Sequence, residues 1–197
     1  MLRRLTGLAA VMLAGILLVA QAGAEVPVPP SGPAVGLDLA GKTVDPLAMA
    51  AGKPLVLIFV RTDCPISNRY APTIQALVQK YSGTAVFMLV YPDKSETRQN
   101  IGKHLHEYGY KTTALRDSQH ALVKMGKVEV TPEAAVFNAK GELIYHGRID
   151  NWYKEFGRAR SAPTTHELED AIQSALNSQH PAPASVSGIG CYISDLQ

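Results

Sequence analysis

The chain has 197 residues, of which 46% are hydrophobic, and its formal net charge is +2 with neutral histidines. This length predicts one globular domain with a sizeable core, and the near-neutral charge excludes the basic surface that is typical of nucleic-acid-binding proteins. In a domain of this size, a disulfide between the two cysteines, Cys64 and Cys191, would serve function rather than folding.

Residues 1–24 predict a secretory signal peptide. Arg3 and Arg4 precede a short apolar stretch that ends in small residues at 22–24, which are typical of a cleavage site. A single-pass anchor is the alternative, but the apolar stretch is short and no basic stop-transfer run follows it. With cleavage after Ala24, the mature protein would be periplasmic or secreted, without a stable membrane anchor. It would keep 17 of the 19 basic residues beside 17 acidic ones.

The expected domain spans residues 36–179, after a proline-rich lead-in at 25–35. Gly36–Met49 predicts a short peripheral hairpin. Leu55–Val60 and Thr84–Tyr91 are continuous apolar runs, which are typical of strands buried on both faces of a sheet. Because a helix separates these two strands, they predict a parallel pair with a right-handed crossover.

The helix between these strands is expected to begin directly after Cys64. Pro65 suits the first helical position, since its missing N–H would be unpaired there. Unpaired N–H groups and the macrodipole favour a thiolate at a helix N-terminus and lower the cysteine pKa, so Cys64 is a candidate nucleophile. The adjacent Asp63 opposes this effect, whereas Arg61 and Arg69 favour it. The apolar face of the helix, at spacings of three and four, comprises Tyr70, Ile74, Leu77, Val78 and Tyr81.

Further elements follow in the second half of the domain. The expected elements are a helix at Ser95–Tyr108, a strand at Thr112–Arg116, a helix at Gln119–Met125, two strands within Glu129–Ile149 and a helix at His166–Ser178. Ser95 is the expected cap of the first helix, and Thr164 or Thr165 of the last. His104 and His106 are interpreted as solvated surface histidines, because residues two apart on a helix do not share a face. No metal site is predicted.

The connection Asp150–Pro163 contains three aromatic residues, Trp152, Tyr153 and Phe156. Two interpretations stay open for it. Long loops often carry function, but these aromatic side chains could instead cover the edge of the sheet.

Several of these features together resemble the thioredoxin superfamily: a buried strand, Cys64-Pro65 at a helix start, and the Ala71-Pro72 pair that follows. The longer layout resembles its redoxin branch, which includes thiol-specific antioxidant and cytochrome-maturation proteins. It has an N-terminal hairpin and an extra strand and helix in mid-chain. The resemblance spans Gly36–Ser178 and implies an α/β, three-layer fold with a central mixed sheet and helices on both faces.

The resemblance also implies supporting residues around Cys64. Thr131-Pro132 matches the cis-proline position of the family, which lies beside the reactive cysteine. A proline there leaves no N–H to compete at the thiol, and it exposes neighbouring backbone groups to an incoming peptide. The chain departs from the family at Ser67, which replaces the second cysteine in a Cys-x-x-Ser motif and cannot resolve a mixed disulfide.

Residues 180–197 form a tail rich in proline, serine and glycine that carries Cys191. Fully extended, the segment from His180 to Gly190 would span roughly 36 Å, enough to cross a domain of this size. We predict that Cys191 forms a reversible disulfide with Cys64. A thiol that stays free or pairs with another molecule is the alternative.

The implied function is thiol-disulfide oxidoreduction, in which catalytic Cys64 attacks a disulfide and Cys191 resolves the mixed disulfide. The expected partners are protein or small-molecule thiols and disulfides, with no cofactor and no nucleic acid. A thiol peroxidase is one alternative, although the peroxiredoxin motif has a threonine where this chain has Arg61. A Cu(I) carrier of the Sco type is another, although such carriers use two closely spaced cysteines and a histidine. A structural module with inert cysteines is the last.

Overall fold

The computed structural model describes residues 33–194 and 196. The expected signal peptide at 1–24 and most of the lead-in at 25–35 lie outside the described residues. No helix within the described part of the chain is long and apolar enough to cross a membrane.

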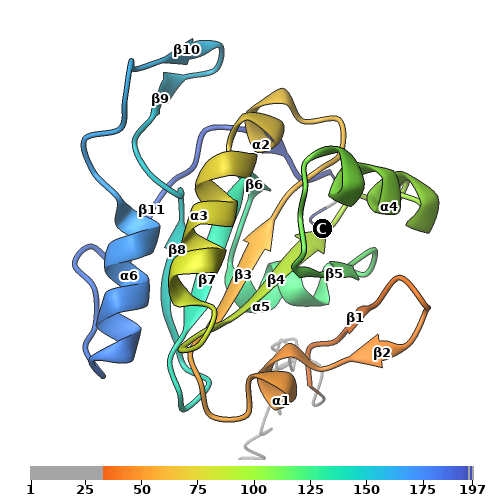
Figure 1. Ribbon diagram of the computed structural model, residues 1–197, viewed down its shortest axis with the longest axis horizontal. Coiled ribbons are helices and arrows are strands. Elements are labelled where there is room, and N and C mark those ends of the chain that lie inside the picture. Colours follow the sequence, from red (N-terminus) through yellow and green to blue (C-terminus); the bar gives the residue numbers. More distant parts are fainter. Residues whose placement is uncertain (1–32, 195, 197) are drawn as a thin grey trace, which may run out of the picture. The chain divides into compact units, whose positions relative to one another are not determined.

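A mixed sheet of eight strands forms the centre of the domain (Figure 1). In sheet order its strands are β11 (Ser185–Val186), β8 (Leu143–Gly147), β7 (Glu133–Phe137), β3 (Leu55–Phe59), β4 (Val86–Tyr91), β5 (Thr113–Arg116), β1 (Gly36–Leu37) and β2 (Thr43–Val44). Strands β3, β4 and β5 are parallel, and β7 runs antiparallel to β3. Every residue of β3 is buried, which confirms the predicted central strand.

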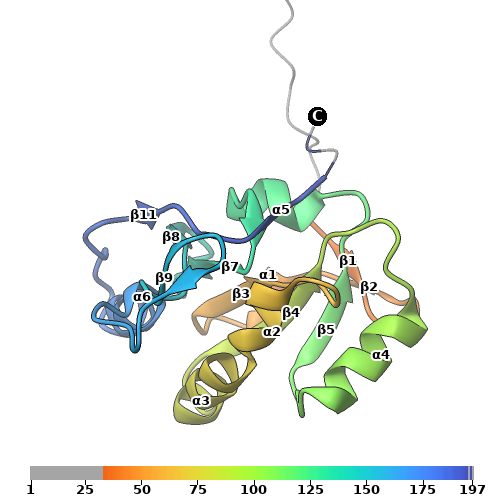
Figure 2. The same ribbon diagram turned by 90° about the horizontal axis from the view of Figure 1, so that it is seen from above.

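Helices cover both faces of this sheet (Figure 2). On one face lie α3 (Ala71–Tyr81), α4 (Arg98–Glu107) and α6 (Glu167–Leu176), and on the other lie α1 (Pro46–Ala50) and α5 (Ala121–Gly126). Alternate residues of β3 point to opposite faces, so Val56 and Ile58 join the first core and Leu55 and Leu57 the second. The predicted three-layer α/β architecture is therefore confirmed.

The first predicted helix is divided in two. A short helix, α2 (Pro65–Arg69), is followed by Tyr70 as its C-cap residue. Helix α3 starts at the next residue and has Pro72 in its first turn. Pro72 cannot donate a backbone hydrogen bond to the preceding turn, which explains the break. The structure also contains α1, which the expected hairpin did not include and which Asp45 caps through its carboxylate.

Two predicted helix caps are wrong. Thr97, not Ser95, caps α4 by accepting a hydrogen bond from the Asn100 N–H, while Ser95 donates its own N–H and hydroxyl to Asp93. Helix α6 begins at Glu167 without a side-chain cap. The two threonines expected to cap it instead bind other side chains: Thr164 bonds to Asn151, and Thr165 donates its hydroxyl to Glu167.

The long connection after β8 forms a second hairpin of β9 (Tyr153–Glu155) and β10 (Arg158–Ala159). Its base packs against the junction of α2 and α3. There the Tyr70 hydroxyl donates to Asp150 at 2.5 Å, and the Arg69 guanidinium lies 5.0 Å from the ring centroid of Trp152. The rings of Trp152 and Tyr153 both lie against Tyr70 and stabilise the helix junction, whereas Phe156 at the hairpin tip is 65% exposed.

Removing the Tyr70 hydroxyl should destabilise this junction. Burial, together with the hydrogen bond to Asp150, raises the pKa of Tyr70, so the phenol keeps its proton and donates to the carboxylate. Tyr70→Phe leaves a buried carboxylate oxygen with one hydrogen bond fewer, which should lower the free energy of unfolding by about 1–3 kcal/mol. Urea unfolding measures this difference. The matched control is Tyr192→Phe at a 78% exposed residue, and an equal effect in both variants would contradict the assignment.

Candidate active site

Cys64 occupies the N-cap position of α2, as the sequence predicted, and Pro65 is the first helical residue. The apolar strand β3 delivers the chain to this point, and the thiol of Cys64 is fully buried at 0% exposure. Its Sγ donates a hydrogen bond to the Thr131 carbonyl oxygen at 3.2 Å. The Thr131–Pro132 peptide bond is cis, as expected from the family pattern. The central strand and the cis-proline segment therefore meet at one sulfur atom.

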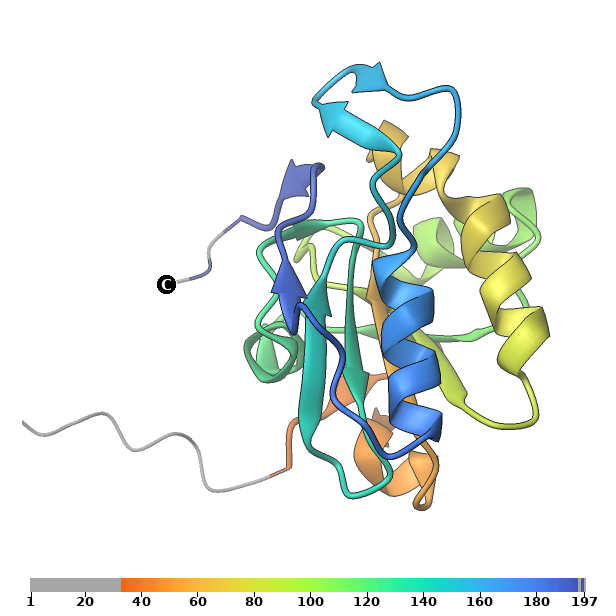
Figure 3. The same cartoon turned by 90° about the vertical axis from the view of Figure 1, so that its left-hand side faces the viewer.

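The tail brings Cys191 to the same place. A short strand, β12 (Cys191–Tyr192), pairs antiparallel with β6 (Val130–Thr131), and Cys191 lies opposite Thr131. The Cys191 Sγ lies 2.7 Å from the Cys64 Sγ, and both cysteines are free. A disulfide has a sulfur–sulfur distance of about 2.05 Å, so a small movement would close the bond. In Figure 3 the C-terminal segment, in dark blue, can be followed along the side of the domain.

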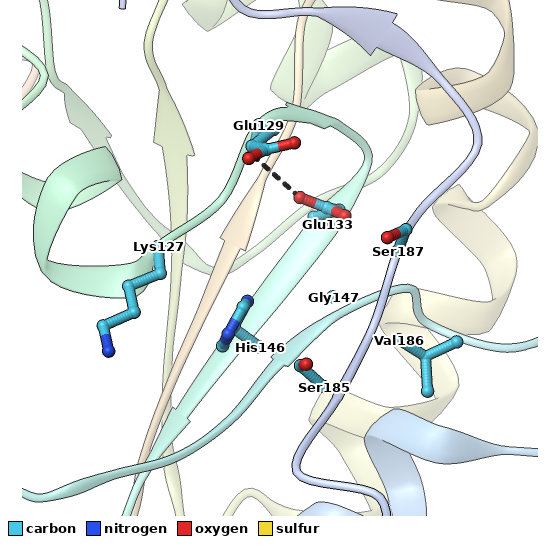
Figure 4. A pocket seen from close by; sticks show the side chains of 8 residues that line it. All are labelled: Lys127, Glu129, Glu133, His146, Gly147, Ser185, Val186 and Ser187. Carbon is cyan, nitrogen blue, oxygen red and sulfur yellow. Dashed lines mark hydrogen bonds between the residues drawn. The ribbon is translucent and has the colours of Figure 1, made fainter.

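A buried carboxylate holds the tail in position. Glu133, the first residue of β7, accepts hydrogen bonds from the backbone N–H of Glu129 at 2.9 Å and of Gly188 at 2.6 Å. Figure 4 shows Glu133 beneath the loop that carries Glu129, in the wall of a polar cavity of about 90 Å³ that Ser185 and Ser187 of the tail also line. Since both carboxylate oxygens are engaged, Glu133 connects the segment before Thr131 to the tail.

Gly190 allows the tail to approach the cis-proline segment closely. A Cβ atom at this residue would lie 2.0 Å from the Thr131 carbonyl oxygen and 2.6 Å from its carbon. Both are rigid backbone atoms, so any side chain here would push the tail away. The residue immediately before Cys191 must therefore be glycine for the two sulfur atoms to meet.

The surroundings separate the pKa values of the two thiols. Burial raises the pKa of Cys64, but the Cys191 thiol and the backbone N–H and hydroxyl of Ser67 favour the thiolate and outweigh burial, so the pKa lies below its ordinary value. The Ser67 hydroxyl is buried and has no hydrogen-bond partner among the described residues, which leaves it available to a thiolate. Burial and the hydrogen bond to Cys64 raise the pKa of Cys191 to about 12.

Ion pairs and hydrogen bonds hold the loop that precedes Cys64. Arg61 bonds to Asp63 and also contacts Asp93 at 3.0 Å, so the carboxylate next to Cys64 is largely neutralised. The backbone N–H of Thr62 donates to the buried Glu96 carboxylate at 2.8 Å. Arg69, which was expected to favour the thiolate, instead lies over the ring of Trp152.

His104 is not the surface residue that the sequence suggested. It is 3% exposed, and its ring nitrogens lie 2.9 Å from the Tyr91 hydroxyl and 2.8 Å from the Asn68 Oδ1. The Asn68 amide in turn donates to the Thr62 carbonyl, so the histidine supports the loop that leads to Cys64. His106 is exposed, as expected. Across the described residues, no group of three His, Cys, Asp or Glu side chains is placed to hold a metal ion.

The five residues predicted to form the site, Cys64, Ser67, Thr131, Pro132 and Cys191, are brought together by the structure. The sequence did not reveal the supporting roles of four further residues, Glu133, Glu96, Asn68 and His104. One of these had a visible signal, because Glu133 is a charged residue at the start of an otherwise apolar strand and directly follows Pro132. The others act through contacts that join distant parts of the chain.

The two thiols should titrate separately. Because the Cys64 pKa is lowered and the Cys191 pKa is about 12, a thiolate should form first on Cys64 as the pH rises. Nuclear magnetic resonance of protein labelled with ¹³C at the cysteine Cβ atoms gives the titration midpoint of each thiol and requires no reagent to reach the buried sulfur. In urea-unfolded protein the two midpoints should coincide. A Cys64 midpoint at or above that of Cys191 in the folded protein would contradict this order.

Replacing Glu133 by glutamine should loosen the tail. A glutamine side chain has one acceptor oxygen, so its NH₂ group would face one of the backbone N–H groups that the carboxylate now binds. We expect hydrogen exchange between Gly188 and Ile193 to become about tenfold faster or more. The matched control is Glu129→Gln on the same loop, whose side chain is exposed. Unchanged exchange in the Glu133 variant would show that another contact holds the tail.

Comparison with known proteins agrees with this architecture. Similar solved structures include a hypothetical protein from Sinorhizobium meliloti, with 20% identity over 81% of this chain and 88% of that chain and a TM-score of 0.68. A secreted disulfide oxidoreductase from Mycobacterium tuberculosis has 19% identity, coverage of 73% and 94%, and a TM-score of 0.50. The exposed lipoprotein thioredoxin of Streptococcus pneumoniae has 19% identity, coverage of 73% and 97%, and a TM-score of 0.53.

At these identities the solved structures show the fold alone, which is thioredoxin-like. No curated protein matches the sequence. The Redoxin family model matches residues 21–157, which is more than half of the chain. The buried strand β3, Cys64 at the start of α2 and the cis-proline segment all lie within that match, and the chain therefore belongs to the Redoxin family.

Proposed function

We propose that this protein catalyses thiol–disulfide exchange with Cys64 and Cys191 as its redox couple. The observation that carries the proposal is the 2.7 Å separation of the two sulfur atoms, in a chain whose motif lacks the second cysteine of the family. The tail supplies the missing thiol. Partners would be proteins or small molecules that carry thiols or disulfides.

The proposed reaction moves two electrons. In the reduced protein, one of the two sulfurs attacks an oxidised partner as a thiolate, forms a mixed disulfide and expels one partner thiolate. The other protein sulfur then attacks the protein sulfur of that mixed disulfide, which closes the Cys64–Cys191 bond and expels the second partner thiolate. The partner leaves as a thiol. A reducing partner reverses these steps and restores both thiols. Ser67 supports the Cys64 thiolate through its N–H and hydroxyl but cannot form a disulfide.

We further propose that the chain works outside the cytoplasm. A reversible disulfide of this kind suits an oxidising compartment, and residues 1–24 have the pattern of a signal peptide. Mass spectrometry of protein purified from the periplasm or the culture medium tests this, and a mature N-terminus at Glu25 is expected. No specific observation favours the Cu(I)-carrier alternative. None favours the peroxidase either, because Arg61 stands at the peroxiredoxin threonine position and is engaged with Asp63 and Asp93.

Substitutions at Cys64, Cys191 and Ser67 should distinguish the two redox cysteines from the residue that supports the Cys64 thiolate. Cys64→Ser and Cys191→Ser should each reduce catalysed exchange with a model disulfide peptide by about 100-fold or more, because neither variant can cycle between a dithiol and an internal disulfide. Ser67→Ala should stay active but need a higher pH, since the thiolate loses a hydrogen-bond donor. Turnover is followed by separating the oxidised and reduced peptides by chromatography.

Two results would refute the redox couple. One is full turnover in Cys191→Ser. The other is that non-reducing digestion of air-oxidised protein gives no linked peptide of Cys64 and Cys191.

A further inference from the structure

The two thiols differ in their access to solvent. Cys64 has no exposed surface, and the Cys191 sulfur and the Thr131 carbonyl both contact its Sγ. Cys191 is only partly buried, and it lines an open hollow of about 680 Å³ between the β9–β10 hairpin and the tail. While the tail is docked, Cys191 is therefore the cysteine that borders solvent, whereas Cys64 has no surface that an outside sulfur atom could approach.

We propose that partners exchange with the sulfur of Cys191, and that Cys64 reacts only with Cys191, inside the protein. This inference rests on the proposed function and specifies which sulfur meets the partner. It reverses the order suggested by the sequence, in which Cys64 attacks the partner and Cys191 resolves.

The chemistry of the reducing half-reaction fits this order. A partner thiolate attacks the Cys191 sulfur of the internal disulfide, the Cys64–Cys191 bond breaks, and Cys64 leaves as a thiolate. A thiol of lower pKa is the better leaving group, and Cys64 is the thiol with the lowered pKa. A second partner thiol then attacks the partner sulfur of the mixed disulfide. This step releases the oxidised partner as a disulfide and returns Cys191 as a thiol, so two electrons enter the protein.

The oxidising half-reaction also begins with exchange between the partner and the Cys191 sulfur. Cys191, after losing its proton, attacks an oxidised partner and forms a mixed disulfide that expels one partner thiolate. The Cys64 thiolate, 2.7 Å away, then attacks the Cys191 sulfur and expels the second partner thiolate. Arg61 favours deprotonation of Cys191, since its positive charge acts to lower the Cys191 pKa against the larger effect of burial.

The contacts that hold the tail against the domain indicate that the tail stays docked during each redox cycle. The tail is held by the backbone pairing of β12 with β6, by the hydrogen bond from the Ile193 N–H to the Glu129 carbonyl, and by the Glu133 carboxylate on Gly188. The hollow beside Cys191 is open without any such movement. Two exposed aromatic side chains border it, Phe156 and Tyr192, and they offer apolar contact to a protein partner.

The site of attack can be trapped chemically. Oxidised full-length protein, in which the Cys64–Cys191 disulfide has been verified by non-reducing digestion, is mixed with excess glutathione and quenched in acid after milliseconds. Acid protonates the thiolates and stops exchange. Peptic digestion and mass spectrometry then locate glutathione, which we expect on the Cys191 peptide. Glutathione on the Cys64 peptide would overturn the inference and leave the redox couple intact. Absence of the starting disulfide would instead refute the proposed function.

A set of variants tests the same point without trapping. Cys191→Ser keeps the tail docked over Cys64, so its single thiol should react slowly with dithionitrobenzoate. Adding Gly190→Ala, which displaces the tail, should accelerate that reaction by about tenfold or more. The matched control adds Gly83→Ala, in the connection between α3 and β4, where a new Cβ would meet no atom of the described residues within 4 Å. Equal rates in Cys191→Ser with and without Gly190→Ala would show that Cys64 is already accessible, and the inference would be wrong.

Discussion

The antiparallel pairing of Cys191–Tyr192 with Val130–Thr131 is the contact on which the chemistry proposed for this protein depends. It involves two residues on each side, yet it joins the tail to the cis-proline segment and sets one sulfur against the other. Without it, Cys64 would be a single buried thiol in a motif that lacks its second cysteine. A backbone ladder fixes position and direction together, so it places the Cys191 sulfur more definitely than a flexible tether could.

The rest of the domain supplies the other half of this contact. Strand β3 and helix α2 hold Cys64, and the loop before it is hydrogen-bonded to Asn68 of α2 and to Glu96 in the connection between β4 and α4. These bonds link the reactive segment to α4 through His104, which burial keeps neutral by lowering its pKa. The tail docks onto this rigid frame. The site is therefore formed by residues of the domain core together with a strand from the C-terminal tail.

Much of the frame could be predicted from the sequence, because its signals are local. The strand at Leu55–Phe59 follows from an uninterrupted apolar run, and the helix start at Cys64 follows from Pro65 and the spacing of apolar residues. From the sequence, the approach of Cys191 to Cys64 could be inferred only from the length of the tail, because Thr131, with which Cys191 pairs, lies 60 residues earlier in the chain. The burial of His104 could not be predicted for the same reason, since its partners Tyr91 and Asn68 lie 13 and 36 residues away in the sequence. The cap of α4 depends on a local choice instead, because Ser95 bonds to Asp93 and leaves the cap position to Thr97.

The tail also closes the outer border of the main sheet. Before reaching the cysteines, it adds β11 in parallel to the last residues of β8, and Gly147 lets the two backbones meet, since a Cβ there would lie 2.0 Å from the Val186 carbonyl oxygen. An uncovered strand border offers unpaired N–H and C=O groups to other molecules, and a short added strand is one of the ways in which proteins block such association. The segment that carries the second thiol therefore also covers part of the exposed border of β8, so we expect a chain cut before residue 185 to aggregate more readily, as well as to lose Cys191.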